Sequence, residues 1–222
     1  MGFIAKDNGG GGDYKRVPPG AYIARCFRLI DLGTQTSDYQ GQAKTAHRIR
    51  ICWEVFGDDE HGQPLADNNG LPLSVSKNYS LSLHPKASLR KELASWRGRD
   101  FTEEEARAFD VSRLLGAYCM INVTENEGSN GKKYTNVASL TPVPAMLKNS
   151  KPAPGHPDQI FDLDKPDMNL FNSFHGALQD LIKLSPEWEV FAKSSNVQPT
   201  QQHAQAAPSD SGFSDMDEEI PF

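Results

Sequence analysis

This chain of 222 residues has few cysteines and no long apolar run. It also lacks the residue spacings that are typical of common enzyme active sites. Its three cysteines, Cys26, Cys52 and Cys119, are odd in number and far apart. They form neither a disulfide framework nor the paired CxxC ligands of a zinc site. We expect three buried free thiols in a reducing compartment.

Segments that would direct the chain to or through a membrane are also missing. No apolar run approaches the roughly 20 residues of a membrane-spanning helix. Residues 1–12, MGFIAKDNGGGG, lack the apolar core of a signal peptide. These absences predict a cytoplasmic protein without membrane contact.

The sequence contains none of the common catalytic motifs considered below. The 6 histidines show no HExxH spacing, no GxSxG elbow is present, and no Gly-Lys-Ser/Thr follows the glycines at 9–12. Asp162 and Asp164 in the segment FDLD suggest nuclease carboxylates that bind Mg²⁺, but a loop before a helix is the plainer interpretation. We therefore expect no catalytic activity, no cofactor and no metal.

Basic residues are absent after Lys193. All 23 Lys and Arg residues and 24 of the 29 Asp and Glu residues precede residue 194, so the body is nearly neutral and the C-terminal part carries most of the net charge of −6. A nearly neutral body can still bind a polyanion if its charges are segregated. The charge therefore permits nucleic-acid binding without requiring it.

Composition divides the chain into five segments. They are a flexible Gly-rich arm (1–19), a β-rich domain (20–145), a proline-rich connection with a helical extension (146–193), a disordered Ser/Gln/Ala linker (194–212) and an acidic tail (213–222). The extension is too small to fold alone, so we expect it to dock on the β-rich domain or on a partner subunit.

Strand and helix patterns alternate through these segments. Strands are predicted at 21–32, 46–56, 73–83, 117–124 and 132–140, with polar loops at 34–45 and 125–131. Helices are predicted at 85–97, from Thr102 with a capping box to Glu105, at 169–184 and from 186. In the second strand Ile49, Ile51, Trp53 and Val55 alternate with polar residues, so one face packs in a core and the other presents Arg48 and Arg50.

Five strands with helices between the third and fourth follow the order of an OB-fold. This fold is a small five-stranded barrel whose face binds oligonucleotides. The predicted class is thus mainly β with added helices, completed by a C-terminal helical extension and a disordered acidic tail.

The last ten residues, FSDMDEEIPF, join an acidic run to an apolar tip. Apolar surface left in water costs about 25 cal/mol per Å², so such a tip suits a pocket on a partner. Residues 214–222 resemble the C-terminal tip of bacterial single-stranded-DNA-binding proteins. The stretch from Tyr79 to Val123 is similar to phage-encoded members of that class.

The resemblance implies a function and a partner-binding segment. It implies a protein that coats and protects single-stranded DNA without sequence preference during replication, recombination and repair, in a bacterium or a phage-infected cell. The tip would recruit processing enzymes through Asp215, Asp217, Glu218, Glu219, Ile220, Pro221 and Phe222, the last with its α-carboxylate. A homo-oligomer is compatible with this function. The alternative is a phage adaptor that binds host replication enzymes through the tail and binds no DNA.

Residues for single-strand binding are basic side chains that contact phosphates and aromatic rings that stack on bases. The candidates are Arg25, Arg28, Tyr39, Arg48, Arg50, Lys77, Tyr79, Lys132, Lys133 and Tyr134. The run from Lys132 to Tyr134 is the strongest candidate, because two lysine charges and a tyrosine ring lie next to each other beside a loop. A solvated sheet face remains an alternative for Arg48 and Arg50, and core packing for Tyr79.

Overall fold

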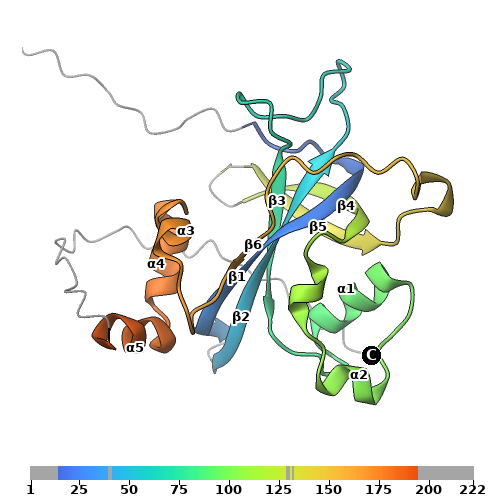
Figure 1. Cartoon of the computed structure of the whole chain (residues 1–222). Helices are drawn as coiled ribbons and strands as arrows, with labels where there is room; N and C mark the ends of the chain where they lie inside the picture. Colours follow the sequence, from blue (N-terminus) through green and yellow to red (C-terminus); the bar gives the residue numbers. More distant parts are fainter. Residues whose placement is uncertain (1–14, 40–41, 129–130, 132, 195–222) are drawn as a thin grey trace, which may run out of the picture.

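One sheet of six strands forms the centre of the protein in a computed structural model that describes residues 15–39, 42–128, 131 and 133–194. Helices lie on both sides of this sheet (Figure 1). In chain order the elements are β1 (Gly20–Tyr39), β2 (Gln42–Phe56), β3 (Ser74–Ser80), α1 (Ser88–Arg97), α2 (Glu103–Arg107), the 3₁₀ helix η1 (Val111–Leu114), β4 (Tyr118–Glu127), β5 (Lys133–Thr141), the 3₁₀ helix η2 (Ala145–Leu147), β6 (Gln159–Phe161), α3 (Met168–Asn172), α4 (Gly176–Lys183) and α5 (Pro186–Ser194).

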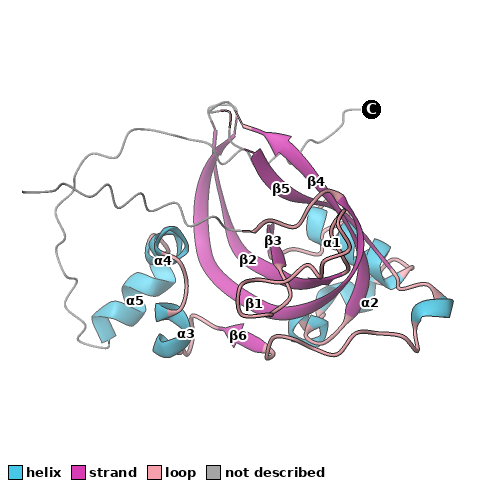
Figure 2. Ribbon diagram, turned by 90° about the horizontal axis from the view of Figure 1, so that it is seen from above, coloured by secondary structure: helices cyan, strands magenta, loops and turns pink. Residues whose placement is uncertain are grey.

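The strands follow the order β3-β2-β1-β4-β5, all antiparallel, with β6 added parallel to β1. The sheet curves strongly, as Figure 2 shows from above. Two register shifts in β1, between Cys26 and Arg28 and between Asp31 and Gly33, help it to bend. Gly33 has a φ of 69°, and a Cβ there would lie 2.5 Å from the Cβ of Ser185, so both the backbone and the packing require glycine.

The prediction of a mainly β protein with added helices is confirmed, with α1 and α2 between the third and fourth strands. The strands described do not close into a hydrogen-bonded barrel. No ladder joins β3 to β5 within the described ranges, so the hydrogen-bonded sheet is open. A side chain crosses this gap, because Lys77 Nζ donates to the carbonyl oxygen of Val137 at 3.2 Å.

The inner face of the sheet packs against α1. Ile51, Trp53 and Val55 of β2 are almost fully buried together with Leu89 and Leu93 of α1. The predicted alternation of β2 is therefore present, and each such side chain contributes about 1.5–3 kcal/mol by leaving water. The predicted capping box also forms, since Thr102 and Glu105 exchange hydrogen bonds at the start of α2.

The outer face of the sheet is covered by helices α3 to α5, which follow β6 in the chain (Figure 1). Ile30 and Leu32 of β1 pack there with Phe161, Phe174 and Ile182. All three cysteines are buried and free. None of the helices in the described ranges has the length and hydrophobicity of a membrane-spanning helix.

Two local predictions were wrong, and one strand was not predicted. The segment predicted as a loop at 34–45 mostly continues β1 and β2 as a ribbon, with Thr36 opposite Thr45. The helix predicted at 169–184 is split in two, because His175 Nδ1 caps α4 by accepting from the backbone nitrogen of Leu178. The strand β6 was not predicted, because its three residues are too short to show a period.

Candidate nucleic-acid interface

The outer face of β2 and β3 carries a row of polar side chains. Strand pairing places Arg48 opposite Ser80 and Arg50 opposite Asn78. Asn78 Oδ1 accepts a hydrogen bond from Arg50 Nε at 2.7 Å, and Ser37 Oγ accepts one from Arg48 Nη2 at 3.1 Å. The two arginines predicted from alternation therefore lie together with amide and hydroxyl groups from the neighbouring strand.

Arg28 adds a third guanidinium to this row from β1. Its register partner is Cys52, which lies two residues from Arg50 on the same face of β2. Diagonal neighbours in a sheet are about 7–8 Å apart, within reach of long side chains. Arg28 Nε donates to Gln159 Oε1 at 2.8 Å, and its guanidinium carbon lies 5.8 Å from the centre of the Phe174 ring.

We call the set Arg28, Arg48, Arg50, Asn78 and Ser80 the arginine face. Arg28 and Arg50 form no ion pair with a carboxylate in the part of the chain that the structure describes, although the helical extension removes water from both. Burial lowers the pKa of Arg28 and of Arg50, only partly offset by the nearby Cys52 thiol. Arginine nevertheless stays charged at neutral pH, so the face holds desolvated positive charge that an anion would stabilise.

Arg25 lies at the end of the same outer face but is enclosed in a buried ion network. It is 6% exposed, its Nη1 donates to Glu54 Oε1 at 2.8 Å, and its Nη2 pairs with Asp158. The carboxylate of Glu54 is fully buried and also accepts from the backbone nitrogens of Gly155 and His156. The prediction that Arg25 contacts DNA has no support in this geometry, because two carboxylates occupy its guanidinium.

Lys77 and Tyr79 of β3 face the inner side of the sheet. Tyr79 is 2% exposed and its hydroxyl donates to Glu92 Oε2, while Lys77 Nζ pairs with the other oxygen of that carboxylate. Burial, followed by the charge of Glu92, raises the pKa of Tyr79. Core packing is the role that this geometry favours for Tyr79, and Lys77 acts at the gap between β3 and β5.

The β4–β5 hairpin brings a charge and a ring to the surface. Lys133 Nζ lies 2.8 Å from Glu125 Oε1, and this hydrogen bond raises the pKa of Lys133. Tyr134 is 45% exposed. Lys132 lies outside the described residues. The salt bridge to Glu125 weakens the attraction of Lys133 for a phosphate, so this end of the sheet is less basic than its sequence suggests.

Other predicted positions fall outside what the structure describes. Tyr39 ends β1, but its side chain is not described. The partner-binding residues of the tail, Asp215, Asp217, Glu218, Glu219, Ile220, Pro221 and Phe222, also lie outside the described ranges.

The carboxylates suggested for a nuclease lie in a turn before α3. Asp162 Oδ1 accepts from the backbone nitrogen of Asp164 at 2.9 Å, and both residues are exposed. Within the described ranges, no group of three or more His, Cys, Asp or Glu residues is arranged to hold a metal ion. The turn therefore accounts for this pair.

Asn78 and Ser80 are members of the arginine face that the sequence prediction missed. The alternation in SVSKNYS contained the signal, since Ser74, Ser76, Asn78 and Ser80 share one side of β3. Comparison of the sequence with protein-family models and with curated proteins gives no match.

Proposed function

We propose that the chain is a single-stranded-DNA-binding protein with an OB-fold body and a C-terminal tip that recruits replication, recombination and repair enzymes. The strand order leaves β3 and β5 as the two ends that an OB barrel would bring together. The helix α1 lies between them in contact with β5, since Ser95 Oγ donates to the carbonyl oxygen of Leu140 at 2.6 Å. Lys77 bridges from β3 to Val137 of β5.

The arginine face carries this proposal. Arg28 and Arg50 hold desolvated charge with no carboxylate partner among the residues described, an arrangement that costs stability unless an anion binds. The guanidinium fork is well suited to phosphate oxygens. Phosphate contacts carry no base information, so this surface supports binding without sequence preference.

Two features outside the arginine face favour single-stranded DNA over other polyanions as the ligand. The acidic tail ending in Ile-Pro-Phe resembles the tip of single-stranded-DNA-binding proteins. The exposed ring of Tyr134 offers a stacking surface that only unpaired bases can use. Duplex DNA keeps its bases inside, so the same protein should bind it more weakly.

A salt-dependent titration tests this function. Fluorescein-labelled oligo-dT is titrated with the full chain at several salt concentrations, with binding followed by fluorescence anisotropy. We expect log K to fall with log salt by about 0.7 for each phosphate contacted, and weaker binding to a duplex of equal length. A salt-independent signal, or equal affinity for duplex, contradicts the proposal. No DNA binding at any salt would favour the adaptor that acts through its tail alone.

A further inference from the structure

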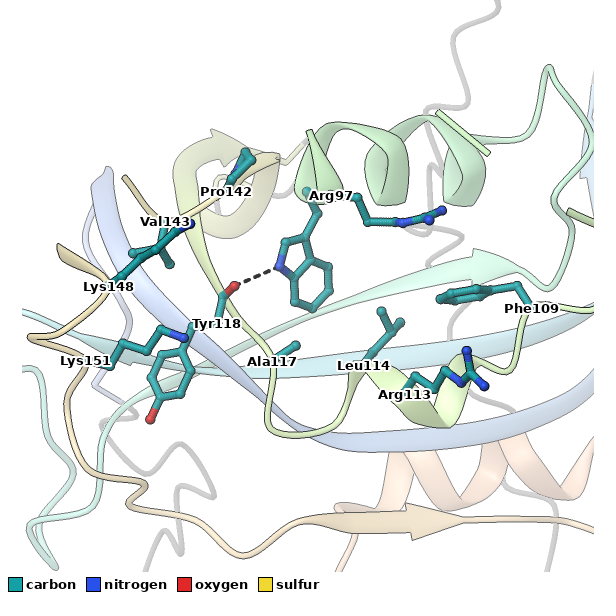
Figure 3. Close-up of a pocket in the computed structure, with 11 residues that line it drawn as sticks. Arg97, Phe109, Arg113, Leu114, Ala117, Tyr118, Pro142, Val143, Lys148 and Lys151 are labelled. Carbon is teal, nitrogen blue, oxygen red and sulfur yellow. Dashed lines mark hydrogen bonds between the residues drawn. The ribbon is translucent and has the colours of Figure 1, made fainter. Parts of the chain in front are cut away.

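A pocket of about 420 Å³ opens between the C-terminal end of α1, η1, the start of β4 and the segment 142–151 (Figure 3). Its lining includes the aromatic and basic residues Trp96, Arg97, Arg113, Tyr118, Lys148 and Lys151. Trp96 and Leu114 of its lining belong to the core on the α1 side of the sheet, whereas the helical extension beside the arginine face lies on the other side of the sheet (Figure 1). The pocket shares no residue with the arginine face, so the two are separate surfaces.

The charged residues that line this pocket are all of one sign. Four lining residues are basic and none is acidic. Arg113, Lys148 and Lys151 are exposed and make no ion pair with any residue that the structure describes. The nearby carboxylate of Asp110 caps η1 by accepting from the backbone nitrogen of Ser112 at 2.9 Å. The rim therefore attracts an anion.

Arg97 differs from the other three basic residues because it is partly neutralised. Its Nη2 lies 2.8 Å from Glu105 Oε1, and its guanidinium carbon lies 4.2 Å from the centre of the Phe101 ring. Its Nη1, however, is buried and has no hydrogen-bond partner among the described residues. Because this buried atom is closed to solvent, the charge open to a ligand comes mainly from Arg113, Lys148 and Lys151.

The walls of the pocket are aromatic and held in place. Trp96 Nε1 donates to the carbonyl oxygen of Tyr118 at 2.9 Å, a bond drawn in Figure 3, and the Tyr118 hydroxyl donates to the carbonyl oxygen of Pro152 at 2.6 Å. Lys151 Nζ lies 5.0 Å from the centre of the Tyr118 ring. A fixed, largely apolar wall under a basic rim suits a ligand with an apolar ring and an anionic group.

We propose that this pocket binds one nucleotide unit, a base with its phosphate, of the same single strand that contacts the arginine face. The inference rests on the proposed function and adds a second contact point on the α1 side of the sheet. A short oligonucleotide fills one site at a time. A longer strand occupies both sites and gains affinity because its second contact is intramolecular.

The double variant R113A/K148A tests the pocket. Both side chains are exposed and lack ion pairs among the described residues, so we expect the fold to persist. The control K91A/R107A removes the same charge from exposed positions of α1 and α2 outside this pocket. Anisotropy titrations compare dT oligomers of about 8 and about 30 nucleotides, which lie within and beyond the roughly 4–16 nucleotides that one OB-fold covers.

We expect the pocket variant and the control to bind the short oligomer with equal affinity. On the long oligomer the pocket variant should bind about tenfold or more weakly than the control. Its salt slope on the long oligomer should fall by about 0.7, the contribution of the one phosphate that the pocket contacts. Equal behaviour of variant and control on both oligomers overturns the pocket proposal, while tight binding by the unmodified chain leaves the proposed function standing. Failure of the unmodified chain to bind either oligomer overturns the proposed function itself.

A second measurement tests whether the pocket binds the acidic tail instead of a nucleotide, because the tail also combines negative charge with apolar residues. A labelled peptide of residues 213–222 is titrated with the same variants of a chain that ends at residue 212. We expect no effect of R113A/K148A beyond that of the control. Loss of peptide binding in the pocket variant, with oligonucleotide binding unchanged, would assign the pocket to the tail and overturn the nucleotide proposal.

Discussion

Replacing Glu54 with alanine is expected to lower the free energy of unfolding by about 3–5 kcal/mol, because it removes one partner of a buried ion pair. Glu54 is fully buried, and its Oε1 accepts from Arg25 Nη1 at 2.8 Å. Its Oε2 accepts from the backbone nitrogens of Gly155 at 3.0 Å and His156 at 2.9 Å. Without the carboxylate, the buried Arg25 keeps Asp158 but loses its fully buried partner, and two backbone donors lose their acceptor.

This network also positions the helical extension. Residues 155–158 are fixed to β1 and β2 immediately before β6, which pairs with β1 at Arg28, Leu29 and Ile30. Loosening the network therefore weakens the attachment of β6 and the helices that follow it. The variant E54Q keeps the side-chain volume and an acceptor oxygen, so its loss should be smaller than that of E54A.

Urea unfolding followed by circular dichroism measures both variants. The control E60A removes a carboxylate whose side chain is 86% exposed, and surface changes of this kind are usually within about 0.5 kcal/mol. If E54A unfolds within about 1 kcal/mol of the unmodified chain, the network does not hold the extension as described.

The double variant R28Q/R50Q is expected to weaken binding to oligo-dT about a hundredfold. Each charged hydrogen bond to a phosphate contributes about 1.5 kcal/mol or more, and 1.4 kcal/mol corresponds to a tenfold change in affinity. Glutamine keeps a polar group near Gln159 and Asn78, the present partners of the two arginines. Anisotropy titration at fixed salt measures the loss.

Stability separates a binding role from a structural one. Burial lowers the pKa of both arginines, so their charge opposes folding when no anion is bound. Removing that charge should leave the melting temperature of the free protein unchanged or raise it. The control R107Q changes an exposed residue of α2 and should affect neither property. If R28Q/R50Q lowers stability and leaves DNA affinity intact, the arginines stabilise the fold and do not bind DNA.

Local patterns predicted the class of the fold because they depend on near neighbours. The alternation from Ile49 to Val55 correctly identified the buried side of β2. The ribbon beyond Gly33 was missed, because its polar residues resemble a loop. Its support comes from distant residues, since Glu187 of α5 accepts hydrogen bonds from both the backbone nitrogen and the hydroxyl of Thr34.

The candidate site was only partly predictable for the same reason. Strict alternation places Arg25 and Arg28 on opposite faces of β1, but the register shift between Cys26 and Arg28 brings both to the outer face. Which arginine is neutralised depends on Glu54 and Asp158, which lie far away in sequence. The desolvation of Arg28 and Arg50 arises from the docking of the helical extension, a contact that no local pattern records.

Photo-cross-linking tests the central claim, that single-stranded DNA lies on the arginine face, most directly. The full chain is saturated with oligo-dT carrying photoreactive thiothymine, irradiated and digested, and the cross-linked peptides are identified by mass spectrometry. We predict cross-links in peptides that contain the residues of this face, namely Arg28, Arg48, Arg50, Asn78 and Ser80. A saturated complex with no cross-link in any of these peptides would contradict the account.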